Sequence, residues 1–89
     1  MKTQKFETEF MNGTTIDPYL ACGQIEAFDI QSEQPEDTIK AFSFIAGTGL
    51  YRSLQGFYGR SVASLVEQGI MTFEGIVNWD KVNSLLNKN

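Results

Sequence analysis

Four glycines interrupt the apolar pattern of this chain within residues 46–60. Gly47 and Gly49 follow one apolar helical pattern, and Gly56 and Gly59 lie inside the next. Glycine often ends a helix. Inside a helix, a glycine lowers helix stability by about 1 kcal/mol relative to alanine. The spacing therefore predicts a helix that ends at Gly47, a tight link, and a second helix that needs a reason for its internal glycines.

Helix-start signals elsewhere agree with a chain of short helices. Asp17 precedes Pro18 as an N-cap, Pro35 opens a further segment, and Asn78 precedes the last apolar one. These residue types favour the cap and the first position of a helix. Together with apolar residues at helical spacing, they predict four helices, over residues 18–28, 35–47, 50–68 and 79–86.

The rest of the chain is predicted to form turns and extended segments in a single domain of residues 1–89. Residues 5–16 centre on an Asn-Gly dipeptide and predict a short β-hairpin, with a frayed arm as the alternative. Residues 29–34 predict a loop. Residues 70–77 predict an extended segment bent at Glu74-Gly75, with a short hairpin as the alternative. The expected fold class is mainly α, with residues 1–16 as hairpin or arm and residues 17–89 as the helical core.

Composition narrows the classes of function. The chain carries 7 basic and 11 acidic residues, a net charge of −4, so general binding to nucleic acid is not expected. Histidine is absent, and Cys22 is the single cysteine. The commonest general base and metal ligand are therefore missing, and we expect no catalytic set, no metal site and no cofactor. In its apolar context Cys22 is expected to be a structural thiol.

Acidic residues near the second helix offer one candidate catalytic cluster. Glu33, Glu36 and Asp37 are close in sequence, and Glu74 and Asp80 form a second, more distant pair. Acids at a helix start are more simply explained by their attraction to its positive end. We expect a non-enzymatic protein. With no apolar run of about 20 residues and no signal-peptide core, it is expected to be soluble and cytoplasmic.

The predicted third helix, residues 50–68, has an unusual outer face. Steps of about 100° per residue place its large apolar side chains on one arc, the expected core side. These are Leu50, Tyr51, Leu54, Phe57, Tyr58, Val62 and Leu65. The opposite face combines small residues with polar ones where an ordinary helix would carry Lys and Glu. The candidate partner-binding residues on this face are Arg52, Gln55, Gly56, Gly59, Arg60 and Ala63.

Three alternatives explain this face. The small residues could let another helix of the same domain approach closely. They could instead accommodate an external partner or a second copy of the chain, with the two arginines as polar anchors. In the third alternative the helix breaks near Gly56 and free backbone N–H groups take a small anion beside Arg60.

The same stretch resembles a family of small phage-encoded proteins of unknown function. Their shared core is matched here by an amphipathic helix from Ile39 to Phe42 and by Thr48-Gly49, Leu54-Gln55-Gly56, Tyr58-Gly59-Arg60 and Leu65-Val66-Glu67-Gln68-Gly69. The match covers about 30 residues. Where the family often has a tryptophan before Leu-Gln-Gly, this chain has Arg52. The resemblance implies a viral origin and expression in the cytoplasm of a bacterial host.

Taken together, these features predict a non-enzymatic phage accessory protein. It would bind a host protein and inhibit or redirect it, in defence evasion or host takeover, and could also form homo-oligomers. The alternatives are a binder of a small anionic ligand such as a nucleotide, and a minor structural protein of the virion. No nucleic-acid or membrane partner is expected.

Overall fold

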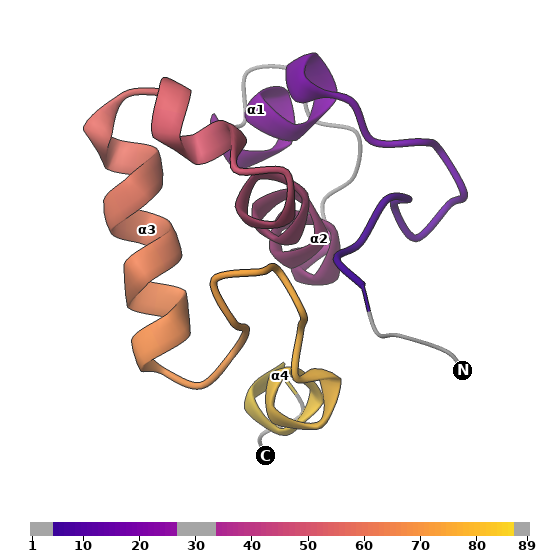
Figure 1. Ribbon diagram of the computed structural model, residues 1–89. Coiled ribbons are helices and arrows are strands. Elements are labelled where there is room, and N and C mark those ends of the chain that lie inside the picture. The colour runs from indigo at the N-terminus through magenta and orange to yellow at the C-terminus, as the bar shows by residue number, and fades with distance from the viewer. Residues whose placement is uncertain (1–4, 27–33, 87–89) are drawn as a thin grey trace.

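The computed structural model describes residues 5–26 and 34–86, and the described chain is mainly helical (Figure 1). The elements run in the order α1 (Pro18–Glu26), α2 (Pro35–Gly47), the 3₁₀ turn η1 (Leu50–Ser53), α3 (Gly56–Glu67) and α4 (Trp79–Leu86). This confirms the predicted mainly α class. The predicted loop at residues 29–34 lies outside the described residues except for Gln34, as do residues 27 and 28 of the first predicted helix.

The helices begin where their sequence signals indicate. Asp17 caps α1, because its Oδ1 accepts a hydrogen bond of 2.8 Å from the backbone N–H of Leu20. Asn78 caps α4 in the same way, accepting from the N–H of Lys81 at 3.1 Å. Pro35 stands at the start of α2. Each cap pairs a backbone donor that the first helical turn leaves free.

Removal of the α1 cap gives a first testable prediction. We expect Asp17→Ala to lower the free energy of unfolding by about 1 kcal/mol, because the N–H of Leu20 loses its side-chain partner. Urea unfolding followed by circular dichroism measures this loss. Glu26→Ala is the control, since this exposed acid lies at the other end of the same helix. Equal stability of the two variants would contradict the cap.

The predicted N-terminal β-hairpin is not supported, because the described residues contain no strand there. The chain reverses through Asn12-Gly13 with a single isolated bridge between Glu9 and Thr15. Only a short return segment precedes Asp17, so a ladder has no room to form. The segment is not a frayed arm either: Phe10 and Ile16 are 2% and 3% exposed.

The predicted continuous helix over residues 50–68 is also wrong. Leu54 and Gln55 adopt extended backbone angles, with ψ of 176° and 156°, and separate η1 from α3. Two interior glycines would cost one continuous helix about 2 kcal/mol. The break moves Gly56 to the first position of α3, where this cost is smaller. The alternative of a break near Gly56 is therefore the observed one.

The segment between α3 and α4 is extended and bent, as predicted. Thr72 and Gly75 close its turn through a backbone hydrogen bond of 2.9 Å, and Gly75 has a φ of 87°. Met71 and Val77 form an isolated antiparallel bridge. The N–H of Asn78 donates to the carbonyl of Ile70 at 2.8 Å, which places the start of α4 beside the end of α3.

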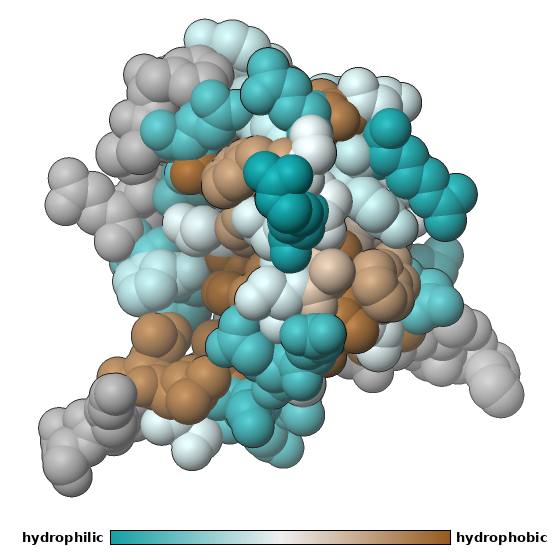
Figure 2. All heavy atoms as spheres, turned by 90° about the vertical axis from the view of Figure 1, so that its left-hand side faces the viewer, coloured by the Kyte–Doolittle hydropathy of each residue, from teal (hydrophilic) through white to brown (hydrophobic). Residues whose placement is uncertain are grey.

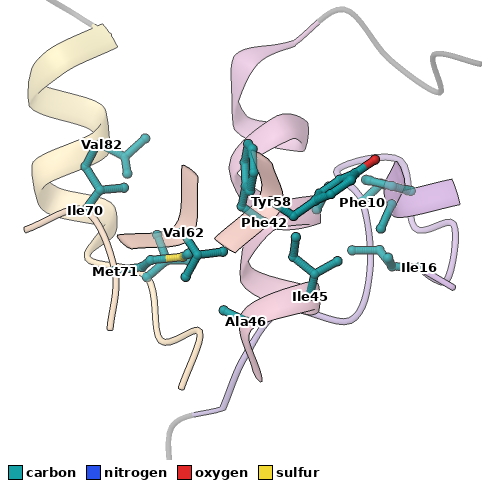
Figure 3. Packing of buried hydrophobic residues seen from close by; sticks show 13 residues of the cluster. Phe10, Ile16, Phe42, Ile45, Ala46, Tyr58, Val62, Ile70, Met71 and Val82 are labelled. Atoms are coloured by element: carbon teal, nitrogen blue, oxygen red, sulfur yellow. The ribbon is translucent and has the colours of Figure 1, made fainter. Parts of the chain in front are cut away.

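The apolar core gathers around α2, which contributes four of its members. Side chains from the N-terminal turn, α3, the segment after it and α4 converge on this helix (Figure 3). The buried cluster comprises Phe10, Ile16, Ala21, Ala41, Phe42, Ile45, Ala46, Tyr58, Val62, Ile70, Met71, Val77 and Val82. The N-terminal turn, α3, the segment after it and α4 are therefore positioned by their contacts with α2, the central helix.

Ser43 joins the N-terminal segment and the 72–75 turn to α2. Its fully buried hydroxyl donates to the carbonyl of Gly75 and accepts from the N–H of Glu7 at 2.8 Å. Phe6 packs beside this contact so closely that a Cβ on Gly47 would overlap its ring. The aromatic ring of Phe44 meets Phe6 edge to face at 6.1 Å. The bonds of Ser43 and the packing of Phe6 thus hold the N-terminal segment and the 72–75 turn against the C-terminal half of α2.

Candidate functional site

The six residues predicted to bind a partner lie on η1, at the break and on α3. Four of them are exposed, and two are partly buried. The exposed residues are Arg52, Gln55, Gly56 and Arg60, and the partly buried ones are Gly59 and Ala63. The face of the molecule seen in Figure 2 carries hydrophilic side chains around smaller apolar areas.

Arg60 lies over the first turn of α3. A Cβ on Gly56 would stand 2.9 Å from one guanidinium nitrogen of Arg60. Gln55 is the N-cap residue of α3 and makes no side-chain capping hydrogen bond. The positive end of the helix and a guanidinium group therefore lie next to each other on the surface.

Gly59 lies beside the ring of Tyr51. A Cβ at this position would stand 3.8 Å from that ring, an ordinary van der Waals contact, so the packing of η1 on α3 does not require a glycine here. The guanidinium carbon of Arg52 stands 5.8 Å from the centre of the same ring. The first alternative, in which a small residue lets another element approach closely, is therefore not supported at Gly59.

The helix break changes which aromatic side chains face the core. Tyr58 and Val62 are buried as predicted, but Phe57 is 45% exposed. The prediction for Phe57 was wrong because it continued one helical register from residue 50, whereas α3 starts a new register at Gly56. Phe57 packs edge to face on Tyr58 at 5.1 Å and stays accessible on α3, three residues before Arg60.

Arg52 also lines a groove that the sequence did not indicate. The groove has a volume of ≈ 300 Å³ and lies between the link after α2 and the 72–75 turn. Its lining residues are Ala46, Gly47, Thr48, Gly49, Tyr51, Arg52, Phe73 and Glu74. The exposed Phe73-Glu74 pair at a turn was the available sequence signal, but its position across the groove from Arg52 depends on the tertiary fold.

A second, apolar groove lies between α2 and α4. Its volume is ≈ 370 Å³, and its lining is apolar except for Thr38. The residues that form it are Pro35, Thr38, Ile39, Ile70, Val82, Leu85 and Leu86. None of the six predicted binding residues contributes to this groove.

The polar groups in the core serve the fold. Asp37, predicted to belong to an acidic helix-start cluster, is 1% exposed and accepts a hydrogen bond of 2.7 Å from the N–H of Met11. Burial, and then the charge of Glu26, raise the pKa of the Cys22 thiol, which favours the unreactive protonated form. Among residues 5–26 and 34–86, no three His, Cys, Asp or Glu side chains are grouped to hold a metal ion.

A helix long and apolar enough to cross a membrane is absent from the part of the chain that the structure describes. The chain was also compared with known proteins. A scan against protein-family models, a search of curated proteins and a search of solved structures each find no match.

Proposed function

We propose that this chain is a non-enzymatic accessory protein of a bacteriophage that binds a host protein in the bacterial cytoplasm and inhibits or redirects it. The observation that carries the proposal is the exposed combination of Arg52, Phe57 and Arg60 on η1 and α3. Arginine and aromatic residues dominate the binding energy of protein interfaces. The phage origin rests on the sequence resemblance described above.

The charge of this surface supports a protein partner. Within residues 5–26 and 34–86, the one ion pair joins Lys40 to Glu7, so neither Arg52 nor Arg60 is paired with a described acid. A protein with a net charge of −4 thus retains two exposed guanidinium groups without a described acidic partner, one on η1 and one on α3. Guanidinium groups left unpaired are available for bidentate hydrogen bonds to carboxylates of a partner.

Capture from bacterial lysate followed by affinity measurement tests this surface. The captured protein is identified by mass spectrometry, purified, and titrated against variants of this chain. We expect Arg60→Ala and Arg52→Ala each to weaken binding by about tenfold or more, the effect of losing an interface anchor. Lys81→Ala is the matched control, because this exposed cation lies on α4. Equal dissociation constants for all three variants would refute the surface.

The uncapped start of α3 favours one alternative function, the binding of a small anionic ligand. The N–H groups of its first turn and the guanidinium of Arg60 are the groups that phosphates accept from. Thermal-shift titration with inorganic phosphate and with nucleotides separates this alternative from the first. Stabilisation that Arg60→Ala abolishes would support it, and no stabilisation by any of these anions would remove it.

A further inference from the structure

The groove beside Arg52 has walls of opposite charge. Arg52 lies on the η1 wall, and Glu74 lies on the wall formed by the 72–75 turn. Both side chains are exposed, and no ion pair joins them to each other or to another residue in the described ranges. By contrast, Lys40 and Glu7 meet at 2.7 Å elsewhere on the molecule. The groove therefore offers one unpaired charge of each sign.

An apolar side chain stands at the edge of the same groove. Phe73 is 49% exposed at the tip of the turn. The turn itself is fixed, because Gly75 is held against α2 by Ser43 and a Cβ on Gly75 would stand 2.9 Å from the backbone nitrogen of Gly47. Phe73 is thus presented by a rigid support, which lowers the entropic cost of burying it against a partner.

We propose that a second copy of this chain occupies the groove in a two-fold symmetric dimer. A two-fold interface joins the same patch on both subunits, so the patch must be complementary to itself. This patch meets the requirement, because it combines an unpaired cation (Arg52), an unpaired anion (Glu74), a protruding ring (Phe73) and the groove itself. Arg52 of each copy pairs with Glu74 of the other, and Phe73 of each enters the other's groove. The inference goes beyond the proposed function: the two surfaces share Arg52, but Phe57 and Arg60 are not part of the groove.

Charge reversal at the two walls tests the pairing. Sedimentation equilibrium of the full chain over a concentration series gives the dimer dissociation constant. We expect a reversible dimer for the unmodified protein, and at least a tenfold weaker one for both Arg52→Glu and Glu74→Arg. The double variant, Arg52→Glu with Glu74→Arg, should restore the dimer, since it exchanges the two charges across the axis. Added salt should weaken the dimer, because the pairs are at the surface.

The two single variants change net charge in opposite directions, which makes the test specific. Arg52→Glu takes the net charge of each copy from −4 to −6, and Glu74→Arg takes it to −2. General repulsion between copies would weaken the dimer in the first and strengthen it in the second. Weakening by both, with restoration in the double variant, supports direct pairing.

Controls separate this inference from the proposed partner surface. Phe73→Ser should also weaken the dimer at least tenfold, whereas Arg60→Glu should change its dissociation constant less than twofold. Circular dichroism should show that all variants keep the helical fold, since the altered side chains are exposed. A protein that stays monomeric at millimolar concentration, or a dimer that survives both single reversals, would overturn the proposal. Either result leaves the prediction for Arg60 and the host protein intact.

Discussion

Gly75→Ala is expected to lower the free energy of unfolding by about 3 kcal/mol, a large part of the total of about 5 kcal/mol typical of a small domain. Two effects add. Gly75 has a φ of 87°, and a left-handed backbone costs an alanine about 1 kcal/mol. The new Cβ would also overlap the carbonyl of Ser43 and stand 2.9 Å from the backbone nitrogen of Gly47. Relieving such overpacking typically costs 1–3 kcal/mol.

Gly13→Ala is the matched control for this prediction. Gly13 has nearly the same φ, 90°, but a Cβ there would meet no atom within 4 Å. We expect this variant to lose about 1 kcal/mol, the backbone cost alone. Urea denaturation of both variants measures the difference. If Gly75→Ala were no less stable than Gly13→Ala, the close packing of the 72–75 turn on α2 would be refuted.

The elements that the sequence predicted correctly are those determined by neighbouring residues. The starts of α1 and α4 follow from Asp17 and Asn78, whose side chains bond backbone groups three residues later. The start of α2 follows from Pro35, whose fixed φ suits the first helical position. Such signals act within one turn of chain, so they can be read without knowing the fold.

The elements that the sequence predicted wrongly depend on distant residues. The N-terminal segment pairs with itself only around one isolated bridge, and it is also bonded to α2: the N–H of Glu7 bonds Ser43, and that of Met11 bonds Asp37. These contacts span 36 and 26 residues and leave no hydrogen-bond pattern in the sequence. Helical periodicity likewise could not show that the chain becomes extended at Leu54, because a leucine is equally suited to the continuous helix.

The candidate site was predicted in the same uneven way. The glycine and arginine pattern located the stretch that carries Arg52 and Arg60. It could not show that Arg52 shares a groove with Phe73 and Glu74, because the fold of α2 and the 72–75 turn creates that neighbourhood. The pattern also did not predict that Phe57 is exposed, since the side of the helix on which Phe57 lies depends on where α3 begins. Local sequence therefore indicates a candidate stretch of chain, but not which side chains surround it in the fold.

Glu7 illustrates how much of this fold depends on the N-terminal segment. One carboxylate oxygen accepts from Lys40 on α2 at 2.7 Å, and the other accepts from the indole N–H of Trp79 on α4 at 3.1 Å. The ammonium group of Lys40 also lies 5.4 Å from the centre of the indole ring. A single side chain thus joins α4 to the central helix. The side chains of Lys40 and Glu7 are 15% and 23% exposed, so solvent screens this pair only in part.

Glu7→Ala should therefore lower the free energy of unfolding by about 2 kcal/mol, since it removes two hydrogen bonds to a charged acceptor. It also leaves the mostly buried side chain of Lys40 without its anion. For a domain of this size, that corresponds to a melting temperature roughly 10 °C lower. Trp79 is the single tryptophan, so its fluorescence reports directly on the start of α4. We expect a red-shifted emission and stronger quenching by acrylamide.

Two further variants separate the role of this carboxylate from a general effect of removing an acid. Glu9→Ala removes an exposed neighbouring acid and should change neither the melting temperature nor the fluorescence appreciably. Glu7→Gln keeps an oxygen that can accept from Trp79 but loses the charge that pairs with Lys40, so its stability should fall between those of the unmodified protein and Glu7→Ala. Because the backbone N–H of Glu7 still bonds Ser43 in every variant, the loss measures the side chain alone. Identical behaviour of Glu7→Ala and Glu9→Ala would show that α4 is held by its apolar contacts through Val82, and not by the bond from Trp79.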